Sequence, residues 1–438
     1  QAEDGIRDRS VSRGLGDVYK RQDLKSFYAS VECVERGLDP FTTNLVVADY
    51  TRGDGGITLA ISPAMKDLGV KNRCRVFEIP KGIEYITAMP RMKKYMDYSA
   101  EIYATYLKYI SQDDIHVYSI DECFFDLTDY LTLYNKSAME IAEMLMNAVY
   151  EKTHICATAG VGTNLYLAKI AMDITAKHIT SHIAYLDEEK YKETLWHHRP
   201  ITDFWNVGHG IAKRLERYGI YDMYDVAHTK EDILYREFGV NAEFLIDHSK
   251  GIEPCTIADI HNYHSKTTSM SNGQILFKDY CYEDAKLVMK EMVDNLTLDL
   301  IAQGLVTDSI SLYIGYSKDV VKSTGGTRKL GCYTSSYKKL VAAFVKFIEE
   351  SAHRDIPIRK ISIGFNRVTA DGFEQFDLFT APDKSEKEEK MQKTILNIKE
   401  KYGKNAVFRG MSLQENATQR MRNGLIGGHK SGEEEQQS

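Results

Sequence analysis

The sequence is organised around residues 118–127, where two adjacent carboxylates, Asp121 and Glu122, interrupt an apolar and aromatic run. The flanking residues, 115–120 and 123–128, are rich in β-branched and aromatic side chains, which predicts two short strands. Neighbouring side chains of a straight strand point to opposite faces. The two carboxylates therefore meet at one point only if the chain turns between the strands.

Carboxylates that gather beside a buried sheet are costly unless they are paired or bound to a metal ion. Hard oxygen ligands of this kind suit Mg²⁺ rather than Zn²⁺. The alternative is an ordinary exposed turn, which is the usual setting of an isolated Asp-Glu pair. The sequence around the pair is therefore needed to distinguish a metal site from an exposed turn.

Two motifs carry a family resemblance. Residues 119–127 read Ser-Ile-Asp-Glu-Cys-Phe-Phe-Asp-Leu and closely resemble the Ser-Ile-Asp-Glu-Ala-Phe-x-Asp core of the Y-family DNA polymerases, the DinB/UmuC/ImpB group. Residues 23–32 read Asp-Leu-Lys-Ser-Phe-Tyr-Ala-Ser-Val-Glu and resemble the first motif of the same family. Residues 426–430 resemble the C-terminus of UmuC-like proteins of Gram-positive bacteria. The first two motifs occur in the family's order, which argues against a chance match.

The resemblance implies that Asp23, Asp121 and Glu122 are catalytic and hold two Mg²⁺ ions, with the backbone carbonyl of Leu24 as a further ligand. Two such ions can activate a primer 3′-hydroxyl and stabilise the leaving pyrophosphate. Phosphoryl-type transfer needs mainly positioning and charge neutralisation, which suits acidic ligands rather than a nucleophilic side chain. The alternative role for Asp23 is to cap the helix that starts near Ser26.

A nucleotide site made of Phe27, Tyr28, Lys66 and Lys169 also follows from the resemblance. The ring of Tyr28 would lie under the sugar and exclude a ribose 2′-hydroxyl by a steric clash. Core packing is the alternative, and it is stronger for Phe27. The two lysines would neutralise the triphosphate, and the alternative for each is an ordinary surface position. Pro63, in a short helix expected over residues 62–68, replaces a hydrogen-bonding side chain of many relatives and puts one triphosphate contact in doubt.

Residues 201–220 predict a helix, a Gly-x-Gly turn and a second helix, which together resemble a helix-hairpin-helix. Gly208 and Gly210 would let the backbone approach a phosphate, and the free amides of the second helix would bind it. Lys213 and Arg214 add positive charge. Binding of this kind is independent of DNA sequence.

Residues 269–366 read as strand, helix, strand, strand, helix, strand, an order that resembles the family's little finger. Arg328 and Lys329 are candidate DNA contacts there, with an ordinary surface position as the alternative. Beyond the last strand, residues 375–379 read Gln-Phe-Asp-Leu-Phe and closely resemble the peptide that docks bacterial enzymes onto the sliding clamp. Its docking residues would be Gln375, Asp377, Leu378 and Phe379.

The implied fold class is an α+β multidomain protein, a right-hand polymerase with a ferredoxin-like palm, small fingers, a helix-hairpin-helix thumb and a β-α-β-β-α-β little finger. The expected parts are a palm over residues 23–34 and 93–185, fingers over 35–92, a thumb over 190–250, a little finger over 266–370, and a clamp-binding motif with a C-terminal tail over 371–438. Residues 251–265 predict a linker, 383–402 an amphipathic helix, and 404–413 a short strand. Residues 414–438 lack periodicity and predict a weakly ordered tail.

Residues 1–22 are polar, rich in arginine and glycine, and without periodicity. They resemble a translated sequencing adapter, and the alternative is a disordered N-terminal arm. In the family an apolar strand leads into the first aspartate. Residues 18–22, Val-Tyr-Lys-Arg-Gln, are a poor substitute, so we expect the central strand of the palm sheet to be damaged, and activity with it.

Composition sets the remaining limits. The 438 residues are 43% hydrophobic, enough for several cores, and no apolar run is long enough for a membrane span. Seven cysteines without a Cys-x-x-Cys pair predict free thiols in a reducing cytoplasm. The net charge of −7 argues against nucleic acid as a partner, but phosphate contact needs only a local basic face.

The sequence thus predicts a template-directed, error-prone translesion DNA polymerase that acts in DNA repair and damage tolerance. Its expected partners are primer-template DNA, deoxynucleoside triphosphates, the bacterial sliding clamp and accessory proteins of the SOS response, with no membrane. The alternative is a catalytically weak or inactive factor that binds DNA and the clamp. Cyclic-nucleotide synthesis on a palm-like fold would require a Gly-Gly-Asp/Glu-Glu-Phe-type turn and no DNA-binding domains, and neither fits.

Overall fold

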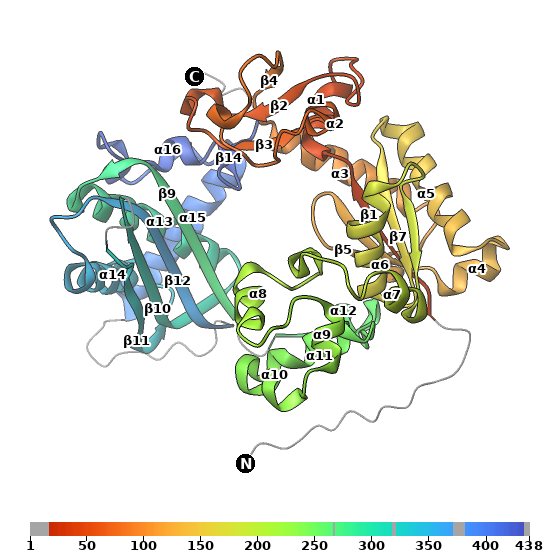
Figure 1. The fold of residues 1–438 in the computed structure, drawn as a ribbon. Coiled ribbons are helices and arrows are strands. Elements are labelled where there is room, and N and C mark those ends of the chain that lie inside the picture. Colours follow the sequence, from red (N-terminus) through yellow and green to blue (C-terminus); the bar gives the residue numbers. More distant parts are fainter. Residues whose placement is uncertain (1–16, 266–267, 318–320, 371–381, 433–438) are drawn as a thin grey trace. The chain divides into compact units, whose positions relative to one another are not determined.

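The computed structural model describes residues 17–265, 268–317, 321–370 and 382–432 (Figure 1). Contacts divide them into two units, one made of residues 17–263 with 429–432 and the other lying within residues 264–428. None of the described helices is long and apolar enough to cross a lipid bilayer.

The first unit contains a five-stranded sheet with helices on both faces (Figure 1). In spatial order, its strands are β5 (Ile115–Val117), β6 (Glu122–Asp126), β1 (Tyr19–Leu24), β7 (Ala157–Gly162) and β8 (Ile183–Leu186). β1 is antiparallel to both of its neighbours, whereas β7 and β8 are parallel. One face packs against α3 (Met92–Tyr106) and α5 (Ala138–Thr153), and the other against α6 (Leu165–Ile170). The two strands predicted around Asp121 and Glu122 are confirmed, but Glu122 is the first residue of β6 rather than part of the turn.

Two glycines of β7 allow α6 to lie directly on the sheet. A Cβ atom on Gly160 would lie 2.1 Å from the carbonyl oxygen of Ala168. A Cβ atom on Gly162 would lie 2.4 Å from the backbone nitrogen of the same residue. Any larger residue at these positions would push α6 away from β7. Lys169 lies on α6 and pairs with Glu122 of β6, so it would move as well.

Residues 19–22 differ from the expectation, because they form most of the central strand. β1 pairs along its length with β6 and β7, so its backbone groups are hydrogen-bonded on both sides. Lys20, Arg21 and Gln22 are nevertheless at most 1% exposed. The prediction that residues 1–22 lie outside the fold is thus wrong for residues 19–22, while residues 1–16 lie outside the described residues.

A small three-stranded sheet lies within residues 45–88, in the order β3 (Thr58–Ile61), β2 (Leu45–Ala48) and β4 (Ile86–Ala88). β2 and β3 are built from runs rich in aliphatic and β-branched residues, as is typical of strands. α2 (Pro63–Asp67) follows, with Ser62 as its N-cap and proline in its first turn. The short helix expected over residues 62–68 is confirmed, although it is one residue shorter at each end. α1 (Phe27–Val34) leads from β1 into this region.

The remaining described α-helices of the first unit are α4 (Thr128–Tyr134), α7 (Glu188–Thr194), α8 (His209–Glu216), α9 (Met223–His228), α10 (Glu231–Phe238), α11 (Ala242–Ser249) and α12 (Ile257–Asn262). α12 lies in the stretch predicted as a linker. A capping box in the sequence could have predicted this helix. The Thr256 side chain accepts a hydrogen bond from the amide of Asp259, and the Asp259 carboxylate accepts one from the amide of Thr256.

The second unit is a four-stranded antiparallel sheet backed by two helices. Its strand order is β11 (Thr324–Thr334), β10 (Leu305–Tyr316), β12 (Ile358–Ala370) and β9 (Thr268–Tyr280). α13 (Tyr282–Ala302) and α14 (Tyr337–Ser351) share a hydrophobic core with it. The predicted strand, helix, strand, strand, helix, strand order is confirmed.

The C-terminal segment is more ordered than its sequence predicts. α15 (Pro382–Tyr402) is confirmed as a helix, but residues 404–413 form no strand and end in a short 3-10 helix, Gly410–Leu413. α16 (Gln419–Arg422) then begins against Glu291, a buried carboxylate of α13. The amides of Thr418 and Gln419 donate to Glu291 Oε2 at 2.8 and 3.2 Å. One buried side chain thus caps α16. Hydrophobic periodicity does not reveal this helix, because it depends on a partner distant in the sequence.

Candidate active site

The turn between β5 and β6 is closed by backbone hydrogen bonds. The amides of Tyr118 and Ser119 both donate to the carbonyl of Glu122, at 3.0 and 3.1 Å. The Ser119 hydroxyl donates to Oδ1 of Asp121 at 2.7 Å. The amide of Leu24 donates to the carbonyl of Asp121 at 3.1 Å, which ties the turn to the end of β1. The predicted strand-turn-strand therefore holds Asp121 where β1 ends.

The strand register brings a third carboxylate to this turn. Asp23 lies directly opposite Glu122 in the antiparallel pair of β1 and β6. Burial, with Glu122 and Asp121 adding to it, raises the pKa of Asp23 to about 6 although Lys177 opposes the shift. Three acidic residues that are far apart in sequence thus form one electrostatic cluster, in which negative charge is costly.

Two lysines and a fourth carboxylate lie against this cluster. Lys177 Nζ is 2.9 Å from Asp23 Oδ2, and Lys169 Nζ is 3.4 Å from Glu122 Oε1. Asp173 pairs with both, at 2.5 Å to Lys169 and 2.8 Å to Lys177. Burial raises the pKa of Asp173, but the two lysines outweigh it and leave the pKa below its usual range.

Sequence reasoning found Lys169 but missed Asp173 and Lys177. The three residues follow one another at intervals of four, which places them on one face of a helical segment. The alternation of charges, Lys-Asp-Lys, on the helix face that carries Lys169 is the sequence feature that could have identified the other two residues.

Arg21 also reaches the cluster, from inside the sheet. Its Nη2 donates to Oε2 of Glu122, and its guanidinium lies over the rings of Tyr118 and Phe124, at 4.2 and 4.1 Å from their centroids. Both oxygens of Glu122 therefore face basic groups. Lys20 points to the opposite face of the sheet, where its Nζ donates to Oε1 of Gln22 at 2.5 Å.

Tyr28 lies at the start of α1, five residues after Asp23. Its ring stacks on that of Tyr95, with 4.5 Å between the centroids. The Tyr95 hydroxyl donates to Oε1 of Glu32 at 2.8 Å, and Arg91 binds the same carboxylate at 2.9 and 2.8 Å. An ion pair between half-buried Arg91 and fully buried Glu32 thus fixes the ring on which Tyr28 rests.

The other predicted nucleotide-site residues lie in different surroundings. Phe27 is 3% exposed, so its ring is part of the core. Lys66, in α2, is within electrostatic reach of Asp23 and Lys177, and loss of solvation lowers its pKa. The structure thus groups Lys66 with the carboxylates and lysines.

The predicted helix-hairpin-helix is only partly formed. Gly208 caps the N-terminus of α8 and Gly210 lies inside that helix, but the element before them is a 3-10 turn over Ile201–Asp203 rather than an α-helix. Gly208, Gly210 and Lys213 are exposed. Arg214 is bonded to Glu237 at 2.8 Å, so part of its charge is already used within the protein.

The two basic residues predicted on β11 point to opposite faces. Arg328 is bonded to Glu350 of α14 at 2.5 Å and its guanidinium lies 3.9 Å from the ring centroid of Phe347. Lys329 is exposed. The expected clamp-docking residues, Gln375, Asp377, Leu378 and Phe379, lie outside the described residues.

Within the described ranges, no three Asp, Glu, His or Cys side chains are arranged closely enough to hold a metal ion. The donor types of Asp23, Asp121 and Glu122 nevertheless fit a hard divalent cation, because all of them offer carboxylate oxygens. Burial is the main cause of the raised pKa of Asp23, with smaller contributions from Glu122 and Asp121, and Lys177 only partly opposes it. Arg21, Lys169 and Lys177 thus form ion pairs with carboxylate oxygens that would otherwise be free to bind a cation.

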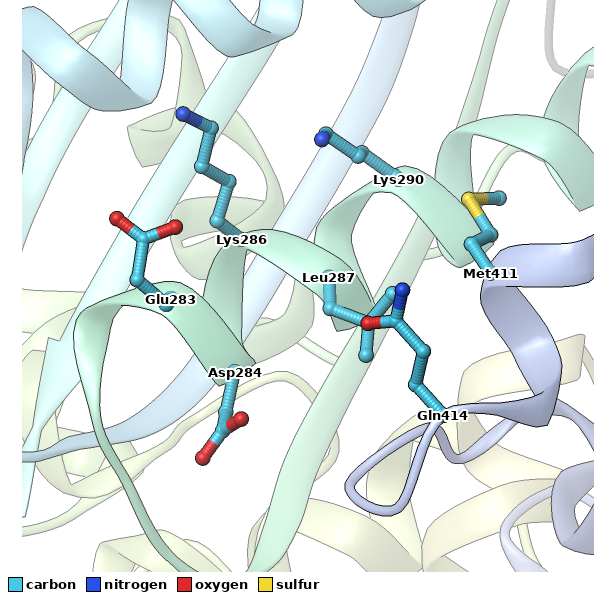
Figure 2. A pocket seen from close by; sticks show the side chains of 7 residues that line it. All are labelled: Glu283, Asp284, Lys286, Leu287, Lys290, Met411 and Gln414. Carbon is cyan, nitrogen blue, oxygen red and sulfur yellow. The ribbon is translucent and has the colours of Figure 1, made fainter.

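A separate surface pocket of 230 Å³ lies in the second unit (Figure 2). Its lining residues come from α13 and from the segment around residue 411: Glu283, Asp284, Lys286, Leu287, Lys290, Met411 and Gln414. Lys286 is already paired with Glu349 at 2.5 Å. The pocket mixes charges of both signs and does not offer the concentrated acidic donors found at the end of β1.

Comparison with known proteins assigns the N-terminal and the C-terminal parts of the chain to the same protein family. Residues 22–173 match the impB/mucB/samB family, and residues 267–378 match the impB/mucB/samB family C-terminal domain. The chain is 32% identical to "Putative UV-damage repair protein UvrX" of Bacillus subtilis (strain 168), over 93% of this chain and 96% of that protein. It is 29% identical to "DNA polymerase IV 2" of the same organism, over 93% of this chain and 97% of the relative.

Among solved structures, a Y-family DNA polymerase chimera, Dbh-Dpo4(243-245)-Dbh, has the same fold, with a TM-score of 0.62 over 81% of this chain and 99% of that chain at 19% identity. The α+β fold class is therefore confirmed. The chain belongs to the impB/mucB/samB family of Y-family DNA polymerases.

Proposed function

We propose that the protein is a template-directed, error-prone translesion DNA polymerase. It adds deoxynucleotides to a primer 3′ end by two-metal-ion nucleotidyl transfer, in DNA repair and damage tolerance. The observation that carries the proposal is the register of β1 and β6, which sets Asp23 opposite Glu122 and beside Asp121. Relatives named DNA polymerase IV support it.

Asp23, Asp121 and Glu122, with the carbonyl of Leu24, would hold the two Mg²⁺ ions. Bound there, the ions would supply the charge neutralisation that phosphoryl-type transfer requires. Lys169 and Lys177 would exchange carboxylate for triphosphate oxygens when a nucleotide binds. Their present ion pairs with Asp23, Glu122 and Asp173 support this role, because they keep both ammonium groups beside the acidic cluster.

Tyr28 would exclude ribonucleotides. Steric exclusion works only if the ring cannot move aside. The stack on Tyr95, which Glu32 and Arg91 anchor, supports such a rigid position. Lys66 would contact the triphosphate from the fingers, and Phe27 would serve mainly to pack the start of α1 into the core.

Contacts with DNA would come from the exposed groups of each unit, namely the turn at Gly208 and Gly210 with Lys213, and Lys329. Arg214 and Arg328 would contribute less, since each is paired with a glutamate. Residues 375–379 would bind the bacterial sliding clamp, and SOS proteins would be accessory partners. The protein would work in the cytoplasm, which its seven free cysteines support.

Primer extension on an undamaged template with Mg²⁺ tests this function. We expect the wild-type chain to extend the primer, and Asp121→Ala/Glu122→Ala to bind the same DNA without extending it. No extension by the wild-type chain, with DNA binding retained, would contradict the proposal.

A second candidate is a factor that binds DNA and the clamp but is catalytically weak or inactive. One specific observation favours it, because Arg21 and Lys169 face both oxygens of Glu122. Such a factor would bind primer-template DNA normally and would show no extension at any Mg²⁺ concentration.

A further inference from the structure

We propose that Arg21 sets how tightly the protein binds divalent cations at the acidic cluster, because its guanidinium competes with the cation for Glu122. The inference rests on the proposed function in taking Glu122 as a metal ligand. It makes Arg21 a positioning residue that acts through Glu122.

The position of Arg21 follows from the register of the central strand. Alternate residues of β1 share a face, so Arg21 and Asp23 point the same way. Across the ladder, Phe124 is opposite Arg21 and Glu122 is opposite Asp23. A basic residue at this position therefore lies next to Glu122, one step along the same face.

The guanidinium depends on Glu122 for its charge balance. Arg21 is 0% exposed, and its Nε and Nη1 have no hydrogen-bond partner among the described residues. Its polar contact is the bond from Nη2 to Oε2 of Glu122, and the rings of Tyr118 and Phe124 enclose it. Removing one partner of a buried ion pair leaves an uncompensated charge. A cation that takes Glu122 has to meet that cost.

Lys169 does not impose the same cost, although it faces the other oxygen of Glu122. Its ammonium lies 3.4 Å from Oε1 but only 2.5 Å from Oδ2 of Asp173, so it keeps a partner when Glu122 turns to a cation. Its side chain is also 10% exposed, whereas that of Arg21 is fully buried. Arg21 is therefore the competitor that cannot be satisfied elsewhere.

Binding of Mn²⁺ to the full chain tests the proposal, with free Mn²⁺ followed by electron paramagnetic resonance and no DNA or nucleotide present. Arg21→Met removes the charge and keeps an unbranched chain between the two rings. We expect it to bind Mn²⁺ at least about tenfold more tightly than wild type, the factor that a hydrogen bond to a charged group contributes. Lys20→Met is the matched control, because Lys20 is equally buried on the opposite face, and we expect its affinity to stay at the wild-type value.

A second pair of variants shows whether Arg21 acts through Glu122. In the Glu122→Gln background, Arg21→Met should leave Mn²⁺ affinity unchanged, because the carboxylate for which Arg21 and the cation compete is absent. Folding is checked by circular dichroism, and Arg21→Leu replaces Arg21→Met if the latter does not fold. Equal or weaker Mn²⁺ binding by the folded Arg21 variant would overturn the inference, as would an equal gain in the Glu122→Gln background.

Failure of this inference and failure of the proposed function give different results. Tighter Mn²⁺ binding by Arg21→Met without primer extension by either protein supports the competition and counts against the polymerase. Extension by wild type, with equal Mn²⁺ affinity of wild type and Arg21→Met, supports the polymerase and overturns the competition.

Discussion

Asp23 on β1 stands directly opposite Glu122 on β6, and each carboxylate has a lysine as its partner. The register of one pair of strands therefore builds the acidic cluster. A slip of one residue would send Glu122 to the other face of the sheet. The hydrogen bond from the Leu24 amide to the Asp121 carbonyl resists such a slip, because it ties the turn to the end of β1.

Lys20→Met should stabilise the fold. Lys20 is fully buried and its partner is the neutral side chain of Gln22, so burial lowers its pKa well below the usual value. We expect a gain of roughly 1–4 kcal/mol in the free energy of unfolding at pH 7. The unfolded chain binds more protons than the folded one below the usual lysine pKa, so wild-type stability rises with pH by up to about 1.4 kcal/mol per unit.

The advantage of the variant should therefore shrink as the pH rises from 7 toward 10. Urea unfolding at three pH values measures it, and Lys213→Met, at an exposed position, serves as the control with little change. A gap that does not depend on pH would show that Lys20 stays charged in the folded protein.

Tyr28→Ala should relax the choice of sugar. Removal of the ring opens the space where a ribose 2′-hydroxyl would lie, so we expect the ratio of ribonucleotide to deoxynucleotide insertion to rise at least about tenfold, or about 1.4 kcal/mol in discrimination. Phe27→Leu is the control, since that ring is buried and its loss should lower stability without changing the ratio. Equal ratios for wild type and Tyr28→Ala would assign Tyr28 to packing alone.

Gly160→Ala should destabilise the first unit severely. The new methyl group would lie 2.1 Å from the Ala168 carbonyl oxygen and 2.4 Å from the Met172 nitrogen, both backbone atoms. We expect a loss of roughly 3 kcal/mol or more, at the upper end of overpacking. Gly210→Ala is the matched control, because nothing lies within 4 Å of its Cβ position and alanine favours the helix by about 1 kcal/mol. Thermal melting of the two variants in opposite directions would confirm the close approach of α6, whereas equal shifts would contradict it.

Much of the site was predictable from local sequence. The many β-branched and aromatic residues on both sides of Asp121 and Glu122 indicate the two strands, and a turn between them is the arrangement that lets adjacent carboxylates meet. Pro63 likewise marks the first turn of α2. These features depend on neighbours in the chain, which a single sequence displays.

The parts that the sequence did not reveal depend on distant partners. Lys20 and Arg21 argue against a buried strand, yet pairing on both sides and contacts with Phe125 and Phe124 place them at the centre of the sheet. Similarly, Glu291 caps α16 from more than a hundred residues away. Tertiary contacts override local propensity in both cases.

Single-turnover insertion of one deoxynucleotide shows most directly whether the paired carboxylates perform nucleotidyl transfer. The comparison needs wild type, Asp23→Asn and Asp126→Asn. Asp126 lies on the same face of β6 as Glu122 but is bonded to Thr128, so it is the matched control. With DNA binding retained by all three, we expect Asp23→Asn to lose at least about a hundredfold in rate and Asp126→Asn to stay near wild type. A wild-type rate for Asp23→Asn would contradict a catalytic role for the cluster.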